Sequence, residues 1–235
     1  MHTVKNTILL GFLLAVSLGF LACAGSQQSA TQNSQEKNAQ VESRAMDKQA
    51  SLELMFQNFL TAVRSNASAD TLYEYLTDTS EYWLDTLENH ARTYDGEALD
   101  TCQFYEAYAI LLYRLYEREH LWQTDDDRML FMMLSKSGVL DRFVGLKLGP
   151  MKVKNDRGSI GLAKSPDVPV MLFEWDDSVW KLNLAETIPL MTKGVESIAV
   201  KKKWSNRKLA LYWLEKEYHM QYSRLDDSLF EPVGF

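Results

Sequence analysis

The sequence is poor in cysteine, in basic charge and in long apolar runs, and each shortage excludes a class of protein. Its two cysteines, Cys23 and Cys102, are too few for a framework of disulfides. Lys and Arg number 25 against 32 Asp and Glu, and this acidic balance argues against nucleic-acid binding. The longest apolar run, from Ile8 to Ala22, is shorter than the roughly 20 residues that a membrane-spanning helix needs.

This apolar run has the dimensions of a secretory signal. Met1–Thr7 precedes it with one lysine and no acid, which is the basic head that such signals carry. At the end of the run, Phe20-Leu21-Ala22-Cys23 resembles the lipobox of bacterial lipoproteins, in which the cysteine becomes the lipid-modified N-terminus. We therefore expect removal of residues 1–22 and lipidation of Cys23, which would tether the chain to a membrane.

A second cleavage site overlaps the first. Ala22-Cys23-Ala24 also fits the A-x-A pattern of ordinary signal peptidase, and cleavage after Ala24 would release a soluble periplasmic or secreted protein. Lipidation is the favoured interpretation because a polar segment follows the cysteine at once. In lipoproteins similar to this one, a residue other than an acid at the position of Ala24 permits transfer to the outer membrane. The resemblance thus implies the outer membrane of the cell envelope rather than the inner one.

Residues 23–49 are expected to form a flexible polar linker behind the lipid. The stretch from Ala24 to Gln49 is rich in Gln, Ser, Ala and Asn, has no aromatic residue, and balances three acids against three bases. It offers little apolar surface to offset the entropy lost on ordering. Residues 50–235 have the length and apolar content of a single globular domain.

The hydrophobic pattern of this domain changes period twice. From Leu52 to about Ser135 apolar residues recur every three or four positions, which predicts N-terminal helices. Between Val144 and Leu184 they alternate in short runs separated by turn residues, which predicts a small curved antiparallel meander of about four strands. After Leu184 the helical period returns for two C-terminal helices, the first with Thr187 as N-cap. The sequence therefore predicts an α+β fold.

Trp175–Leu184 forms a W-x-x-x-x-W hairpin followed by a lysine and an alternating apolar run. With helices before it, this order resembles the cone-shaped α+β superfamily of nuclear transport factor two, ketosteroid isomerase and scytalone dehydratase. The resemblance implies a cone-shaped pocket, where enzymes of the superfamily place an Asp, His or Tyr. None of their catalytic signatures can be matched residue by residue. Tyr82, Asp85 and His90 are the only weak catalytic candidates, and core packing and a solvated helix face also explain them.

Metal and cofactor sites are not expected. Glu117-x-x-His120 occurs once, whereas carboxylate-bridged metal bundles need two such motifs and further glutamates. Glu215 and His219 lack the third ligand that zinc requires. Cys102 lies in an apolar-periodic segment, so a buried side chain is the preferred interpretation over a reactive thiol.

A basic run is the most prominent surface feature of the sequence. It comprises Lys201, Lys202, Lys203, Trp204, Arg207 and Lys208. One interpretation places these cations at a helix C-terminus, where the helix dipole favours positive charge. The other makes the run a membrane-surface patch that contacts anionic lipid headgroups.

Two functions remain open on these grounds. The first is a membrane-tethered lipoprotein with a non-catalytic binding or interaction domain in the cell envelope. Its partners would be the membrane, through the lipid on Cys23, and an envelope protein or apolar ligand. The alternative is a small envelope enzyme that uses a cone-shaped pocket for acid–base chemistry.

Overall fold

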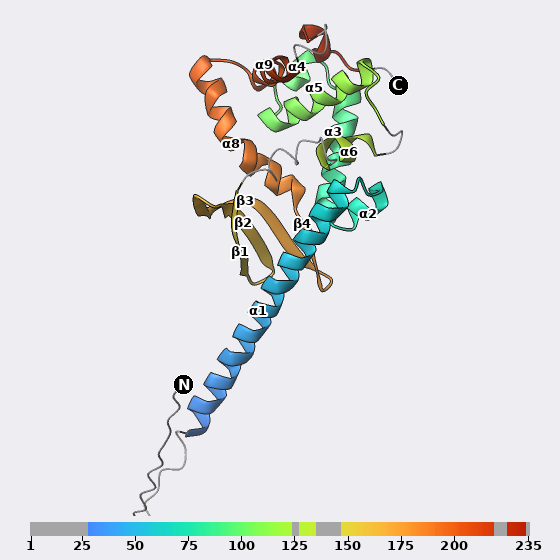
Figure 1. The fold of residues 1–235 in the computed structure, drawn as a ribbon. Coiled ribbons are helices and arrows are strands. Elements are labelled where there is room, and N and C mark those ends of the chain that lie inside the picture. Colours follow the sequence, from blue (N-terminus) through green and yellow to red (C-terminus); the bar gives the residue numbers. More distant parts are fainter. Residues whose placement is uncertain (1–27, 124–126, 135–146, 219–224, 234–235) are drawn as a thin grey trace, which may run out of the picture. The chain divides into compact units, whose positions relative to one another are not determined.

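The computed structural model describes residues 28–123, 127–134, 147–218 and 225–233. The chain divides into two units, residues 1–42 and 43–235, and the sheet and all helices after α1 belong to the second. The helices are α1 (Gln28–Arg64), α2 (Ala69–Tyr73), α3 (Asp78–Thr93), α4 (Gly96–Leu99), α5 (Phe104–Arg118), α6 (Arg128–Leu134), α8 (Leu184–Lys202), α9 (Asn206–Tyr218) and the 3-10 turn η1 (Asp227–Phe230). The strands are β1 (Leu148–Lys154), β2 (Arg157–Leu162), β3 (Ser165–Asp176) and β4 (Val179–Leu182). Helices before and after an antiparallel sheet confirm the α+β prediction (Figure 1).

Helix α1 begins at Gln28, so residues 28–49, which were expected to belong to a polar linker, are helical. Gln, Ala, Glu, Lys and Arg dominate this stretch, and all have high intrinsic helix propensity. Glycine and proline are absent from the whole of α1. A lack of apolar surface does not prevent a helix in residues of such high propensity. Helix α1 already contacts the sheet at Lys48, whose carbonyl accepts a hydrogen bond from the Trp180 indole N–H at 2.8 Å.

The predicted meander is confirmed as a four-stranded antiparallel sheet in the order β1-β2-β3-β4. Two of its expected turns are misplaced, because Gly149-Pro150 lies inside β1 and residues 165–167 open β3. Irregular register at both places explains the difference, since a bulge accommodates a proline on an edge strand. The residues Val144 and Leu146, which were expected in a strand, lie outside the described part.

Helix α1 covers one face of the sheet. The rings of Phe56 and Phe173 meet edge to face with centroids 5.7 Å apart. Gly158 lies under the helix, where a Cβ would come within 2.5 Å of the Leu52 Cδ2. A glycine on β2 is therefore what lets α1 approach the sheet so closely.

A cluster of ion pairs lies on the opposite face of the sheet. The Arg157 guanidinium reaches Glu174 at 3.1 Å and Glu186 at 2.9 Å, and the Arg157 side chain is largely exposed. One packed face and one solvated face agree with the alternating pattern of the strands.

Helix α8 begins earlier than the sequence suggested. Asn183 is its N-cap, and its side-chain oxygen accepts the backbone N–H of Glu186 at 2.9 Å. Thr187, the predicted cap, is buried in the first turns and its hydroxyl accepts the Leu172 N–H of β3 at 3.0 Å. Pro189 consequently lies inside the helix rather than in its first turn.

Helices α3, α6, α8 and α9 and the turn η1 pack around α5 (Figure 1). Helix α8 also contacts β3, so it joins the sheet to this layer. Within the ranges that the structure describes, no helix has both the length and the apolar character to cross a bilayer.

A fully buried arginine, Arg114, lies at the centre of the helical layer. All of its hydrogen bonds in the described part of the chain end on backbone carbonyls, of His90, Ala91, Tyr94, Leu229 and Phe230. Burial lowers the pKa of the Arg114 guanidinium to about 10. This side chain thus ties the end of α3 to the C-terminal turn η1.

Candidate binding surface

The basic run lies where α8 turns back into α9. Lys201 and Lys202 occupy the last turn of α8, and Lys203 is its C-cap with a φ of 54°. This left-handed residue reverses the chain, and α9 then packs on α5 beside the end of α8. Lys208 falls in the first turn of α9, so the cations of the run come from two helices.

Aromatic and basic side chains alternate at four-residue spacing along α9. Trp204 precedes the helix, and Lys208, Tyr212 and Lys216 follow at steps of four. Because a helix has 3.6 residues per turn, this spacing keeps successive members on one face. We call these four residues, together with Lys202 of α8, the lysine–aromatic stripe.

The members of the stripe contact one another through ring faces. The Trp204 and Tyr212 rings lie edge to face at 5.2 Å. The Lys202 ammonium is 4.2 Å from the centre of the Trp204 ring and 4.8 Å from that of Tyr212. Lys208 lies 5.4 Å from the Trp204 ring, and Lys216 lies 5.0 Å from the Tyr212 ring. A hydrogen bond with Lys216 and the charges of Lys216 and Lys202 lower the pKa of Tyr212, which marks the surface as electropositive.

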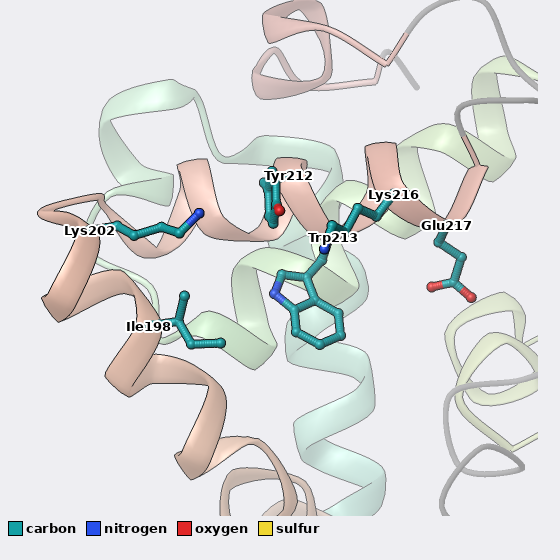
Figure 2. A pocket seen from close by; sticks show the side chains of 6 residues that line it. All are labelled: Ile198, Lys202, Tyr212, Trp213, Lys216 and Glu217. Atoms are coloured by element: carbon teal, nitrogen blue, oxygen red, sulfur yellow. The ribbon is translucent and has the colours of Figure 1, made fainter.

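A cleft of about 560 Å³ opens beside the stripe, between α8 and α9. Figure 2 shows Ile198 and Lys202 entering it from α8 and the other lining side chains, Tyr212, Trp213, Lys216 and Glu217, from α9. Trp213 is 38% exposed, and its ring meets Phe104 edge to face at 6.4 Å. The cleft therefore offers apolar and aromatic walls with ammonium groups at the rim.

A second hollow of about 490 Å³ borders the stripe. It is lined by Trp204, Ser205, Arg207, Lys208, Leu211, Tyr212, Glu215, Asp227 and Phe230. Tyr212 lines both hollows, so the stripe runs between them.

Arg207 does not belong to the exposed patch that the sequence predicted. Its guanidinium pairs with Asp100 at 3.1 Å, donates to the Gly96 carbonyl, and lies 4.4 Å from the Phe230 ring centre. This charge is used to hold α9 against α4 and η1. The predicted patch is thus reduced to its lysines and Trp204.

Those lysines are exposed and without a carboxylate partner among the residues described. Lys201, Lys202, Lys203, Lys208 and Lys216 all project into solvent, and no ion pair within the described ranges involves them. Between residues 200 and 218 the acids are Glu215 and Glu217. Glu217 accepts a hydrogen bond from the Tyr108 hydroxyl at 2.9 Å. A locally basic surface therefore lies on a chain of formal net charge −7.

The weak catalytic candidates on α3 do not assemble at these cavities. Tyr82 is 75% exposed, and Asp85 is exposed as well. The His90 ring stacks on Tyr94 at 3.9 Å, and burial lowers the pKa of its imidazole. A third hollow, of about 510 Å³, lies between α1 and β1, and Tyr82, Asp85 and His90 do not line it either.

Two other residues that the sequence singled out, Glu117 and Cys102, are held by hydrogen bonds or by burial. Glu117 accepts hydrogen bonds from the Trp122 indole and from Arg128, each at 2.6 Å. Cys102 is buried as predicted, and burial raises the pKa of its thiol to about 11. Among the described residues, no group of three His, Cys, Asp or Glu side chains could hold a metal. Cys23 and His219 lie outside the described ranges.

Comparison of the chain with known proteins finds no matching family, no similar curated protein and no similar solved structure. The resemblance of the hairpin to the cone-shaped superfamily therefore stays a prediction. The surface between α8 and α9 has to be interpreted from its own chemistry.

Sequence reasoning found only part of this surface. It missed Tyr212, Trp213 and Lys216, because it considered the basic residues as a consecutive run. The available signal was the recurrence of aromatic and basic residues every four positions from Trp204. That period predicts a shared helix face once α9 is recognised as a helix.

Proposed function

We propose that the chain is a membrane-tethered lipoprotein of the bacterial cell envelope whose folded domain is a non-catalytic binding module. The lysine–aromatic stripe and the cleft beside it form the binding surface. The observation that carries this proposal is the cleft of about 560 Å³, which has Trp213 and Tyr212 as walls and Lys202 and Lys216 at its rim. Aromatic faces and ammonium groups of this kind hold an anionic or amphipathic partner.

The chemistry of the cleft favours binding over catalysis. General acid–base catalysis needs a group that exchanges a proton near neutral pH within reach of the substrate. The lysine ammonium groups of the cleft are exposed to solvent, and its carboxylate, Glu217, accepts the Tyr108 hydroxyl. The ammonium groups of the cleft can attract an anionic partner, and its aromatic rings can stack against that partner.

The tether is the part of the proposal that comes from the sequence alone. Cys23 follows an apolar run in a lipobox-like context, and Ala24 fits a protein of the outer membrane. Lipid on Cys23 would hold the binding surface near the membrane. A single acyl chain binds only weakly, whereas the several chains of a lipoprotein anchor the protein stably.

The test is the intact mass of the membrane-extracted protein, with fractionation of the wild type, Cys23→Ser and Cys102→Ser. We expect the wild type to gain the mass of a diacylglyceryl group and an acyl chain, and Cys23→Ser to leave the membrane fraction. Cys102→Ser is the matched control, because it removes the other cysteine, and it should stay in the membrane. A soluble wild type that begins at Gly25 would overturn the tether and favour cleavage after Ala24.

A further inference from the structure

We propose that the lysine–aromatic stripe docks on the phosphate-bearing headgroups of an anionic phospholipid bilayer. This would give the protein a second membrane contact besides the lipid on Cys23. The inference rests on the proposed function and names the partner of its binding surface.

The charge of the α8–α9 turn favours an anionic partner. The lysines around the α8–α9 turn are exposed and have no carboxylate partner within the described ranges, whereas the chain as a whole is acidic. An anionic surface is therefore attracted to this region and repelled by the average charge elsewhere. Arg207, the basic residue of the turn that the fold itself uses, is paired with Asp100 and takes no part.

The length of the stripe favours an extended surface over a single small anion. Lys208 and Lys216 are eight residues apart on α9, which corresponds to about 12 Å along the helix axis. Lys202 adds a third ammonium from the neighbouring helix. One phosphate group cannot contact all three, whereas the headgroups of a bilayer surface can do so together.

The aromatic residues of the stripe favour a membrane surface. Trp204 and Tyr212 stand between the lysines, and Trp213 is partly exposed in the adjoining cleft. Tryptophan and tyrosine prefer the membrane–water interface, where the ring is buried and the polar edge stays hydrated. Lysine stems can lie along the same apolar depth while their ammonium groups reach the phosphates. Val200, 79% exposed beside Lys201, adds apolar surface at the same end of α8.

The inference is tested with the mature chain from residue 23 carrying Cys23→Ser, so that no lipid contributes. Its co-sedimentation is measured with vesicles of phosphatidylcholine alone and of phosphatidylcholine with phosphatidylglycerol. The variant K202Q/K208Q/K216Q removes three lysines of the stripe. The matched control K147Q/K154Q/K164Q removes three exposed lysines of the sheet region and changes the net charge equally.

We expect binding only to the vesicles that contain phosphatidylglycerol, weakened by added salt. Each lysine near an anionic surface contributes roughly fivefold in affinity, so the stripe variant should bind about a hundredfold more weakly. The sheet control should change affinity by no more than about fivefold. Unchanged far-ultraviolet circular dichroism and melting temperature in both variants show that the fold is intact.

Three outcomes would overturn the inference. Equal binding to both kinds of vesicle would mean apolar adsorption, and equal loss in the two variants would mean a response to net charge alone. Binding to soluble polyphosphate without binding to vesicles would identify a soluble polyanion as the partner. None of these outcomes affects the tether, which the mass of the membrane-extracted wild type decides separately.

Discussion

The Arg114 Nε donates a hydrogen bond of 2.8 Å to the carbonyl oxygen of Ala91, in the last turn of α3. Carbonyls at a helix C-terminus have no partner within the helix, and the helix dipole gives that end a negative potential. Arg114 donates to carbonyls at this helix end and places its positive charge in the negative potential. Its other donors reach the carbonyls of Tyr94 and of η1. The end of one helix thus compensates a buried charge that has no carboxylate partner among the described residues.

Replacing Arg114 by methionine should destabilise the domain strongly. The substitution keeps most of the apolar stem but leaves several buried carbonyls without donors, and each costs about 1–3 kcal/mol. We expect a loss of about 3 kcal/mol or more in the free energy of unfolding, measured by urea denaturation. Arg157→Met is the control, because Arg157 is exposed on the sheet and should cost less than about 1 kcal/mol. Equal losses in the two variants would contradict this account.

The role of Arg114 is not readable in the sequence. It stands in a stretch of α5 with apolar residues on both sides, and arginine is usually exposed. It is buried because the end of α3 and the turn η1, 20 or more residues away, converge on it. Hydrophobic periodicity shows which face of a single helix is buried, but it does not show which distant elements pack against that face.

The candidate surface shows the same division between local and distant information. Lys201–Lys203 and Trp204 were found because they are neighbours in the sequence. Arg207 does not belong to the patch because it forms an ion pair with Asp100, more than 100 residues earlier. No local sequence pattern indicates that pair. The α+β order and the four strands were predicted well, since changes of hydrophobic period are local. The early start of α1 does not appear in the hydrophobic period, because it depends on the helix propensity of polar residues.

Two glycines should respond in opposite directions to substitution by alanine. In Gly158→Ala the new Cβ would lie 2.5 Å from the Leu52 Cδ2 and 3.2 Å from the Phe173 Cβ, so either the buried Leu52 side chain or α1 itself must move. We expect a loss of about 2 kcal/mol in the free energy of unfolding from this overpacking. In Gly194→Ala, inside α8, the Cβ meets no atom within 4 Å beyond its own helix neighbourhood. This variant should gain about 0.5–1 kcal/mol from the higher helix propensity of alanine.

The comparison uses urea denaturation of both glycine variants. A stable Gly158→Ala would mean that the Leu52 side chain moves aside without cost and that α1 does not require a glycine at this position. The variant Gly158→Ala/Leu52→Ala offers a further check, because removing the Leu52 methyl groups should relieve the clash. The two substitutions together should then cost less than the sum of their separate losses.

The hydroxyl of Ser80 joins α3 to the start of α8. It is fully buried, accepts the Leu184 N–H at 2.8 Å and donates to the Leu182 carbonyl at 3.4 Å. Ser80→Ala leaves the first N–H of α8 without this acceptor, so we expect a loss of about 2 kcal/mol by thermal or urea denaturation. Ser197→Ala, on the exposed side of α8, should change stability by less than about 0.5 kcal/mol. A similar loss at both sites would refute the bridging role of Ser80.

Acidification should weaken the fold through His90. Burial lowers the pKa of this imidazole, the nearby Glu106 partly opposes the shift, and the ring stacks on Tyr94 at 3.9 Å. Below its ordinary pKa of about 6.5 the unfolded chain binds a proton that the folded chain still resists. The contribution of His90 to stability is therefore present above pH 6.5 and is lost as the pH falls towards the lowered pKa. His90→Phe keeps the stacking and removes the titration, so its stability should fall less than that of the wild type between about pH 7.5 and about pH 5.5. Because the carboxylates are common to both proteins, the difference between their denaturation curves isolates His90, and parallel curves would show that folding does not shift its pKa.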